Sequence, residues 1–255
     1  MQRTQQYTRV FILCAGDGSR WNNYLGIPKQ LIQFNCESLL ARAARMLGEE
    51  GIDDFICVSN DRRLQLPGIV HFHPEKHNCL AETILATRHL WTSRTIFLLG
   101  DVYFTRRSVN SISRYRGELG VFGRPWASKL IDCTHGELFA MSFSAEAAAF
   151  VTRAAEEVAR LVVHGARGNL WDVYHTLSDL PLNSGRAESR IFQIVDDITN
   201  DFDRPSDYIL RGSTYEAFAS SRTLEKVFYA ARLAGRYPAH ILARRPVAIS
   251  ALRRI

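Results

Sequence analysis

Apolar residues in the first half of the chain fall into two alternating patterns. Short uninterrupted apolar runs are typical of buried strands, and they predict strands at 9–13, 54–59, 68–72 and 95–99. Longer segments repeat their apolar positions every three or four residues, which is typical of amphipathic helices. Such helices are predicted at 38–49, at 80–91 with Asn78 as the N-cap, and at 105–115.

The second half of the chain has a less regular pattern. Strands are predicted at 120–124 and 137–143, and an alanine-rich helix is predicted at 145–163. The segment 190–208 carries a further apolar alternation that ends in a cluster of acidic residues. Two helical pieces, at 214–234 and 239–253, are separated by the turn-forming sequence GRYP.

The order of these elements predicts the fold class. Strands that alternate with helices and are apolar on both faces belong to mostly parallel sheets with helices on both sides. We therefore expect an α/β protein. A chain of 255 residues fits one such domain, or one domain with an appendage.

Composition excludes several other classes. Hydrophobic residues make up 46% of the chain, which is ordinary for a globular core. No stretch approaches the roughly 18 apolar residues that a membrane span requires, and no long apolar segment follows the initial MQRTQQYTRV. We therefore expect a cytoplasmic protein without a signal peptide. The five cysteines are scattered without a C-x-x-C pair, which indicates reduced, mostly structural thiols.

Positive charge is concentrated toward the C-terminus. The formal net charge is +6, and nine basic residues but only two acidic ones lie from Arg211 onward. The remainder is close to neutral, so we expect a domain at 1–212 and a basic helical extension at 213–255. The extension could bind an anionic partner, form a homodimer, or present a solvated helix face.

The sequence CAGDGSRW, at 14–21, follows the first predicted strand directly. A glycine-containing turn at this place lets backbone N–H groups converge on phosphate oxygens, and Gly16 and Gly18 have no Cβ to obstruct them. The Rossmann pattern G-x-G-x-x-G fails because Trp21 takes the third position. The P-loop pattern fails as well, since no G-K-[ST] follows.

Two cationic residues follow this turn closely. Arg20 stands two residues after Gly18, and Lys29 follows a proline in PKQL. The guanidinium offers a planar fork for phosphate oxygens, and the ammonium is a compact second cation. Together with the loop amides, these side chains fit a triphosphate.

Three motifs together resemble the nucleotidyltransferases, a family that includes sugar-phosphate nucleotidylyltransferases, cytidylyltransferases and molybdenum-cofactor guanylyltransferases. They are LCAGDGSRW with LGIPKQLI, then LLGDVYF, then NDFDRPSDY, in family order over roughly 9–210. The resemblance implies a Rossmann-like three-layer α/β/α sandwich with a mixed, mostly parallel sheet. It also implies that a nucleoside monophosphate passes from an NTP to a phosphorylated acceptor, with release of pyrophosphate.

The resemblance further implies roles for particular residues. Arg20 and Lys29 would contact the triphosphate and act in catalysis. Asp101 would bind Mg²⁺ together with Asp203, or with Asp201 as the alternative. The nucleotide-binding loop would consist of Leu13, Ala15, Gly16 and Gly18.

The nucleobase and the acceptor are less well specified. Asn78 and Thr83, with Glu82, fall where the family reads the base, although Asn78 and Glu82 also suit a helix start. The similarity of GIPKQL to cytidylyltransferases favours CTP or UTP. Arg124 and Lys129 are candidates for binding the acceptor, which is expected to be a sugar phosphate or an alcohol phosphate.

Two other functions remain open at this point. Asp201-Phe202-Asp203 is a D-x-D sequence, the metal signature of glycosyltransferases of the related GT-A fold that use a nucleotide sugar. The chain could also be a non-catalytic nucleotide-binding protein that engages a partner through its basic extension.

Overall fold

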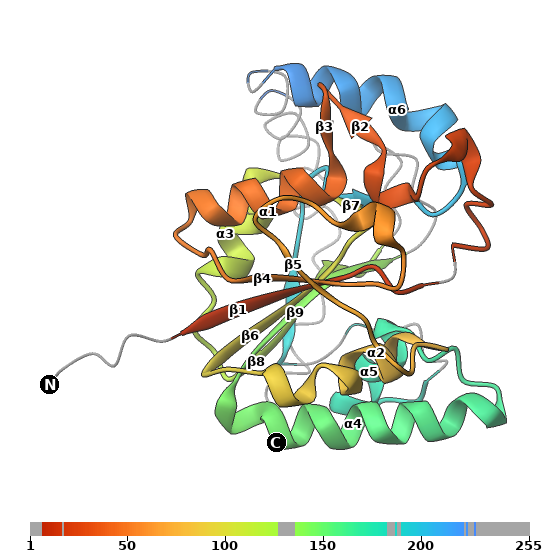
Figure 1. The fold of residues 1–255 in the computed structure, drawn as a ribbon. Helices are drawn as coiled ribbons and strands as arrows, with labels where there is room; N and C mark the ends of the chain where they lie inside the picture. Colours follow the sequence, from red (N-terminus) through yellow and green to blue (C-terminus); the bar gives the residue numbers. More distant parts are fainter. Residues whose placement is uncertain are drawn as a thin grey trace, which may run out of the picture.

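The computed structural model describes residues 7–16, 18–126, 136–182, 187, 190–221, 223 and 227. A seven-stranded sheet lies at its centre, in the order β10-β8-β9-β6-β1-β4-β5 (Figure 1). Only β9 among these strands is antiparallel to its neighbours, β6 and β8. The strands are β1 (Thr8–Leu13), β4 (Phe55–Val58), β5 (Val70–Phe72), β6 (Arg94–Leu99), β8 (Leu119–Arg124), β9 (Glu137–Ser144) and β10 (Phe192–Ile194). The predicted mixed, mostly parallel sheet is confirmed.

Helices cover both faces of this sheet (Figure 1). One face carries α1 (Leu39–Glu49) and α3 (Arg106–Ser113), and the other carries α2 (Leu80–Ala86), α4 (Ala148–Leu161) and α5 (Leu170–Leu177). Successive residues of β1 point to opposite faces, so Val10 and Ile12 join one buried cluster while Phe11 and Leu13 join the other. This division confirms the three-layer α/β/α arrangement and explains why the central strands are apolar throughout.

A smaller unit packs beside α1 at the edge of the sandwich. It contains β2 (Gln33–Phe34), β3 (Glu37–Ser38), β7 (Val102–Tyr103), β11 (Asn200–Asp201) and α6 (Pro205–Ser220) (Figure 1). Its core is an aromatic cluster that includes Trp21, Phe34, Tyr103, Phe202 and Tyr215.

The end of the domain differs from the prediction. Helix α6 continues across residue 212, and both Tyr215 and Phe218 are buried in the aromatic cluster. The boundary predicted at 212 is therefore corrected, because the packed body extends at least through Phe218. The helix predicted at 239–253, and most of the one at 214–234, lie outside the described residues.

The helix predicted at 80–91 also differs in its details. It ends as α2 at Ala86, where the Thr87 hydroxyl donates to Ile84 O at 2.7 Å and accepts from Trp91 Nε1 at 3.0 Å. Asn78 is not its N-cap; Cys79 takes that position, and the Asn78 backbone N–H donates to Glu82 Oε2 at 2.9 Å. Short 3₁₀ segments complete the chain at Tyr24–Gly26, Lys29–Leu31, Arg62–Leu64, Arg88–Leu90, Ala145–Ala147 and Val162–His164.

In the part of the chain that the structure describes, none of the helices is both long enough and apolar enough to cross a membrane.

Candidate active site

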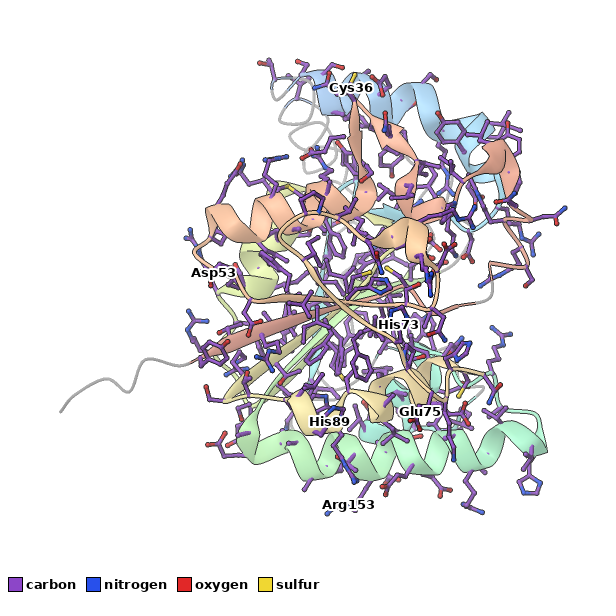
Figure 2. All side chains as sticks on the ribbon, in the orientation of Figure 1. Cys36, Asp53, His73, Glu75, His89 and Arg153 are labelled. Carbon is purple, nitrogen blue, oxygen red and sulfur yellow. The ribbon has the colours of Figure 1, made fainter. Side chains whose placement is uncertain are left out.

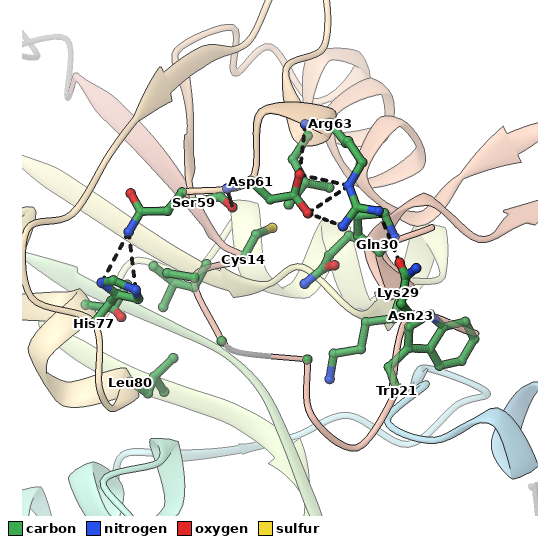
Figure 3. A pocket seen from close by; sticks show the side chains of 18 of the residues that line it. Cys14, Trp21, Asn23, Lys29, Gln30, Ser59, Asp61, Arg63, His77 and Leu80 are labelled. Carbon is green, nitrogen blue, oxygen red and sulfur yellow. Dashed lines mark hydrogen bonds and ion pairs between the residues drawn. The ribbon is translucent and has the colours of Figure 1, made fainter. Parts of the chain in front are cut away.

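A cavity of about 750 Å³ lies next to the loops that follow β1 and β4 (Figure 3). Its walls are the loop after β1, the segment 28–30, the loop 59–64 and the start of α2 with the residues before it. In open α/β sheets ligands bind at the carboxyl ends of the strands, where these loops lie. Leu13, Ala15, Gly16, Gly18, Lys29, Asn78 and Thr83, all predicted site residues, line this cavity.

The loop after β1 is anchored at both ends. Cys14 N donates to Val58 O at 2.9 Å, and the backbone N–H groups of Trp21 and Asn22 both donate to Gly18 O. Gly18 has φ of +63°, a left-handed conformation that favours glycine. A Cβ on Gly16 or Gly18 would meet no heavy atom within 4 Å, so this side of the loop is open to a ligand.

The segment between Arg20 and Lys29 is held in an unusual backbone conformation. Asn22, Asn23 and Leu25 all have positive φ. Trp21, which is 1% exposed, secures the segment by donating from Nε1 to Ile27 O at 2.8 Å. This segment sets the place from which Lys29 extends.

Arg63 braces the same segment from the opposite wall of the cavity (Figure 3). Its Nη1 donates to Asn23 Oδ1 at 3.1 Å and to Gly26 O at 3.3 Å. The rest of its guanidinium is held by Asp61, with Nη2 to Oδ2 at 2.6 Å. Sequence reasoning missed Asp61 and Arg63, although both lie just after a predicted strand at the edge of the sheet where ligands bind.

Four charged side chains converge beside the cavity, and one of them, Lys29, lines it next to Gly16 and Gly18. Lys29 Nζ lies 2.5 Å from Asp101 Oδ2 and 2.7 Å from Asp203 Oδ1. Arg20 forms an ion pair with the other oxygen of Asp203. The structure thus brings together the predicted residues Arg20, Lys29, Asp101 and Asp203.

Backbone pairing explains how Asp203 reaches this point. β11 pairs with β7, with Asp201 opposite Val102, and Phe202 N donates to Asp101 O at 3.0 Å. The loops that carry the early and the late aspartates are therefore joined by main-chain hydrogen bonds. Asp207 then accepts from the backbone N–H of Asp203 at 2.9 Å, which fixes the turn into α6.

Negative charge is in excess around this cluster. Burial alone would lower the pKa of Lys29, but the charges of Asp101 and Asp203 outweigh it and hold that pKa above its ordinary value. Burial, with the charges of Asp101 and Asp203, raises the pKa of Asp201 to about 7. Burial, with the charges of Asp201 and Asp203, raises the pKa of Glu137 to about 9. A further cation would stabilise the ionised forms of these carboxyl groups.

The oxygen-rich cluster has the donor chemistry that Mg²⁺ prefers. Asp101 and Asp203 both direct a carboxylate oxygen to one point, the position that Lys29 Nζ holds. Within the described ranges, no group of three or more His, Cys, Asp or Glu side chains is arranged to hold a metal ion. A metal here would therefore need ligands besides the protein, such as phosphate oxygens and water.

Arg124 does not lie where an acceptor phosphate could reach it. The residue is 0% exposed, and its guanidinium donates to Thr199 O at 3.0 Å and to Asn200 Oδ1 at 2.7 Å. The prediction of acceptor binding by Arg124 is corrected, because strand β8 extends through this residue and buries it beneath β11. Lys129, the other predicted acceptor-binding residue, lies outside the described residues.

The far end of the cavity is lined by polar side chains, among them Ser59 and His77 (Figure 3). Asn60 Nδ2 lies 3.2 Å from Pro74 O and 3.2 Å from His77 Nδ1, so it links the loop after β4 to the segment before α2. Asn78 is exposed, whereas Thr83 is buried and donates to Cys79 O at 3.2 Å. Asn60 and His77 are further pocket residues that sequence reasoning missed.

A second cavity, of about 650 Å³, lies on the other side of α2 (Figure 2). Its lining includes His73, Glu75, Glu82, His89 and Glu156, with both acidic and basic side chains. Glu82, predicted beside the base, lines this second cavity, but seven other predicted site residues line the first one, so the first cavity is the candidate active site.

The fold and the cavity define an α/β protein with a candidate active site at the carboxyl edge of its sheet. Residues 10–169 match the family model described as the MobA-like NTP transferase domain, and the chain belongs to this family. It is therefore an enzyme of the nucleotidyltransferase class, and the glycosyltransferase and non-catalytic alternatives are set aside. The match covers Arg20, Lys29 and Asp101 but ends before Asp203.

Solved structures share the fold. CTP:phosphocholine cytidylyltransferase from Streptococcus pneumoniae superposes with a TM-score of 0.57 at 15% identity, over 82% of this chain and 99% of that chain. The inositol-1-phosphate CTP transferase from T. maritima gives 0.55 at 13% identity, over 85% and 97%. A putative glucose-1-phosphate thymidylyltransferase from Bacillus anthracis gives 0.54 at 11%, over 83% and 95%. No curated protein matches the chain.

Proposed function

We propose that this enzyme transfers a cytidylyl or uridylyl group from CTP or UTP to a phosphorylated acceptor, with release of pyrophosphate. The observation that carries the proposal is the convergence of Arg20, Lys29, Asp101 and Asp203 beside a glycine-containing loop. Two cations match the phosphate chain of a nucleotide, and two carboxylates match the divalent ion that accompanies it.

The chemistry asks the protein mainly to position groups and to balance charge. An oxygen of the acceptor phosphate forms a bond to the α-phosphorus, and the bond from the α-phosphorus to the bridging oxygen of pyrophosphate breaks. Lys29 and Arg20 balance the negative charge that the departing pyrophosphate carries, and the amides of the loop with Gly16 and Gly18 orient the phosphates. Excluding water from the cavity would strengthen these interactions.

Asp101 and Asp203 are the proposed ligands of Mg²⁺, with Asp201 as the alternative to Asp203. When bound, the ion would neutralise phosphate charge and hold the reacting phosphates in place. Asp207 and the β7–β11 pairing keep the two carboxylates in register for this purpose.

The far end of the cavity is the proposed nucleobase site. Asn78 and Thr83, as expected from the sequence, and Asn60 and His77, from the structure, line this end. The preference for CTP or UTP is supported by the resemblance of GIPKQL to cytidylyltransferases and by two structural neighbours that use CTP. The acceptors named for the neighbours, phosphocholine and inositol 1-phosphate, support an alcohol phosphate, and glucose 1-phosphate supports a sugar phosphate.

A pyrophosphate-release assay tests this function. The full chain is incubated with Mg²⁺, each of the four NTPs and a panel of sugar and alcohol phosphates. The proposal expects release with CTP or UTP and one acceptor class, abolished by Asp101→Asn. Release with GTP or ATP alone would overturn the proposed base preference, and no release with any combination would overturn the proposed reaction.

The role of the basic segment after residue 212, as a dimer contact or as a site for an anionic partner, stays a prediction. Truncation should follow Ser221, because α6 up to Phe218 belongs to the packed body. Light scattering of the truncated and full chains then tests whether the segment holds a dimer. The same oligomeric state for both chains would exclude that role.

A further inference from the structure

One ammonium group holds the position that the proposed metal would need. Lys29 Nζ lies 2.5 Å from Asp101 Oδ2 and 2.7 Å from Asp203 Oδ1, so it bridges the two carboxylates. Its side chain is 14% exposed, and those of Asp101 and Asp203 are 17% and 21% exposed. A partly buried bridge of this kind is screened by solvent less than a surface pair.

A divalent ion and this ammonium cannot share the two oxygens. Mg²⁺ binds carboxylate oxygens at about 2.0–2.1 Å, so an ion between Asp101 and Asp203 would stand against the lysine nitrogen. Repulsion between the two cations is strong at such a distance in a partly buried site. One of them must leave.

The same lysine also lines the phosphate end of the cavity. Its backbone is fixed by Pro28 and by the short 3₁₀ segment Lys29–Leu31, so only the four-carbon side chain needs to move. A swing toward the cavity would carry the ammonium from the carboxylates to a phosphate chain beside Gly16 and Gly18.

We propose that Lys29 is an internal counter-ion that closes the metal site until a polyphosphate draws it away. This inference rests on the proposed function, because it takes Asp101 and Asp203 as the metal ligands. Its consequence is that metal binding and phosphate binding favour each other. A phosphate that draws Lys29 away from Asp101 and Asp203 opens the metal site, and a metal that displaces Lys29 leaves its ammonium available to the phosphate. Metal alone binds weakly to the free enzyme, since it must displace the ammonium without a phosphate to receive it.

Binding of Mn²⁺ alone, followed by electron paramagnetic resonance, tests the proposal directly. Lys29→Met should bind Mn²⁺ about tenfold or more tightly than the native chain, because a competing charge is gone. Arg20→Gln is the matched control: it removes a cation that pairs with Asp203 but is 61% exposed and makes no bridge. Its effect should stay below about threefold. Equal tightening in both variants, or none in Lys29→Met, would overturn the proposal.

A measurement on the native chain covers the case in which Lys29→Met does not fold. Acetylation of Lys29 by a water-soluble acylating reagent is followed by peptide mass spectrometry. Saturating Mn²⁺ should speed this acetylation several-fold by freeing the amine, and inorganic tripolyphosphate added with the Mn²⁺ should suppress it. The exposed Lys76 should react at one rate throughout. An unchanged rate at Lys29 would overturn the inference.

Asp101→Asn separates this inference from the proposed function. If Asp101→Asn abolishes Mn²⁺ binding while Lys29→Met leaves it unchanged, the counter-ion role fails and the metal assignment stands. If Mn²⁺ binding survives Asp101→Asn, the metal assignment fails and the counter-ion role fails with it. Tripolyphosphate serves as the phosphate probe because all four NTPs share its chemistry, so an incorrect base preference does not affect the result.

Discussion

The two ends of the active-site cavity are built in different ways. At the phosphate end, Lys29 lines the cavity and belongs to a network of ion pairs with Asp101, Asp203 and Arg20, which lie beside it. At the far end, Asn60, His77 and Asn78 come from two loops, are exposed, and are linked by hydrogen bonds such as Asn60 Nδ2 to His77 Nδ1 at 3.2 Å.

We propose that the phosphate end carries out the reaction and that the far end selects the nucleotide. Charges held in a partly buried network suit the phosphates, which are the same in every NTP. Exposed, neutral hydrogen-bonding groups suit a base edge, where donors and acceptors differ from one nucleotide to another. Substitutions at the phosphate end should therefore reduce turnover for all nucleotides, and those at the far end should change the choice among them.

The largest effect is expected at the phosphate end. Lys29→Met should lower kcat/KM by about 10²–10³ for every NTP accepted, because a cation aimed at the developing charge is lost. Steady-state kinetics of pyrophosphate release measures this loss, with circular dichroism as the test of folding. Lys76→Met, which removes an exposed lysine lining the second cavity, is the control and should keep its rate. A fall in kcat/KM for one nucleotide alone would contradict the assignment of Lys29 to the end that treats all nucleotides alike.

A smaller effect is expected at the far end. Asn60→Ala removes the link from the loop after β4 to Pro74 and His77. The ratio of kcat/KM for the preferred nucleotide to that for its nearest competitor should fall about tenfold. Competition between two labelled NTPs measures this ratio. If turnover fell equally for both nucleotides, Asn60 would belong to the catalytic end instead.

A lesser effect is expected where the two ends are braced together. Arg63→Gln frees the segment with Asn23 and Gly26 from the wall formed by the loop after β4. The Arg63 side chain is 51% exposed, so its ion pair is weak, and KM for the NTP should rise only about two- to fivefold. Arg88→Gln, which breaks an exposed pair with Glu156 outside the cavity, should leave KM unchanged. A fall in kcat without a change in KM would contradict a bracing role.

The smallest effect is expected outside both ends. Cys36 lies at the outer end of the β2–β3 hairpin (Figure 2), and it has φ of +60° after Asn35 at +51°. Two residues with positive φ favour Asn-Gly. Cys36→Gly should therefore raise the free energy of unfolding by about 0.5 kcal/mol, about 1–2 °C in Tm, without changing kcat/KM. Calorimetry and the release assay check both parts, and a lower Tm would argue against strain at this turn.

The phosphate end could be predicted from the sequence because its residues stand at recognisable places. Arg20 lies in the glycine-containing turn after the first strand, and Asp101 stands just after another buried strand; the carboxyl ends of neighbouring parallel strands meet at one edge of a sheet. Arg20 and Lys29 were predicted from their place after the turn and their charge, and the roles of Asp101 and Asp203 from the family resemblance. Their contacts depend on the left-handed backbone after Trp21 and on the β7–β11 pairing, which local patterns do not show.

Two errors have a common physical origin. Arg124 was predicted at the end of a strand with its side chain available to a ligand, yet the side chain is buried and its guanidinium donates to Thr199 O and Asn200 Oδ1. The boundary at 212 ignored the packing of Tyr215 beneath the hairpin. In both cases tertiary burial, which depends on residues far along the chain, overrode the local pattern.

The most direct test of the central claim is a crystal structure of the full chain with CTP and Mn²⁺. The account predicts the triphosphate against Gly16 and Gly18, with Lys29 Nζ on a phosphate oxygen. It also predicts an anomalous manganese peak between Asp101 and Asp203. A nucleotide bound in the second cavity, or a manganese peak away from both aspartates, would contradict it.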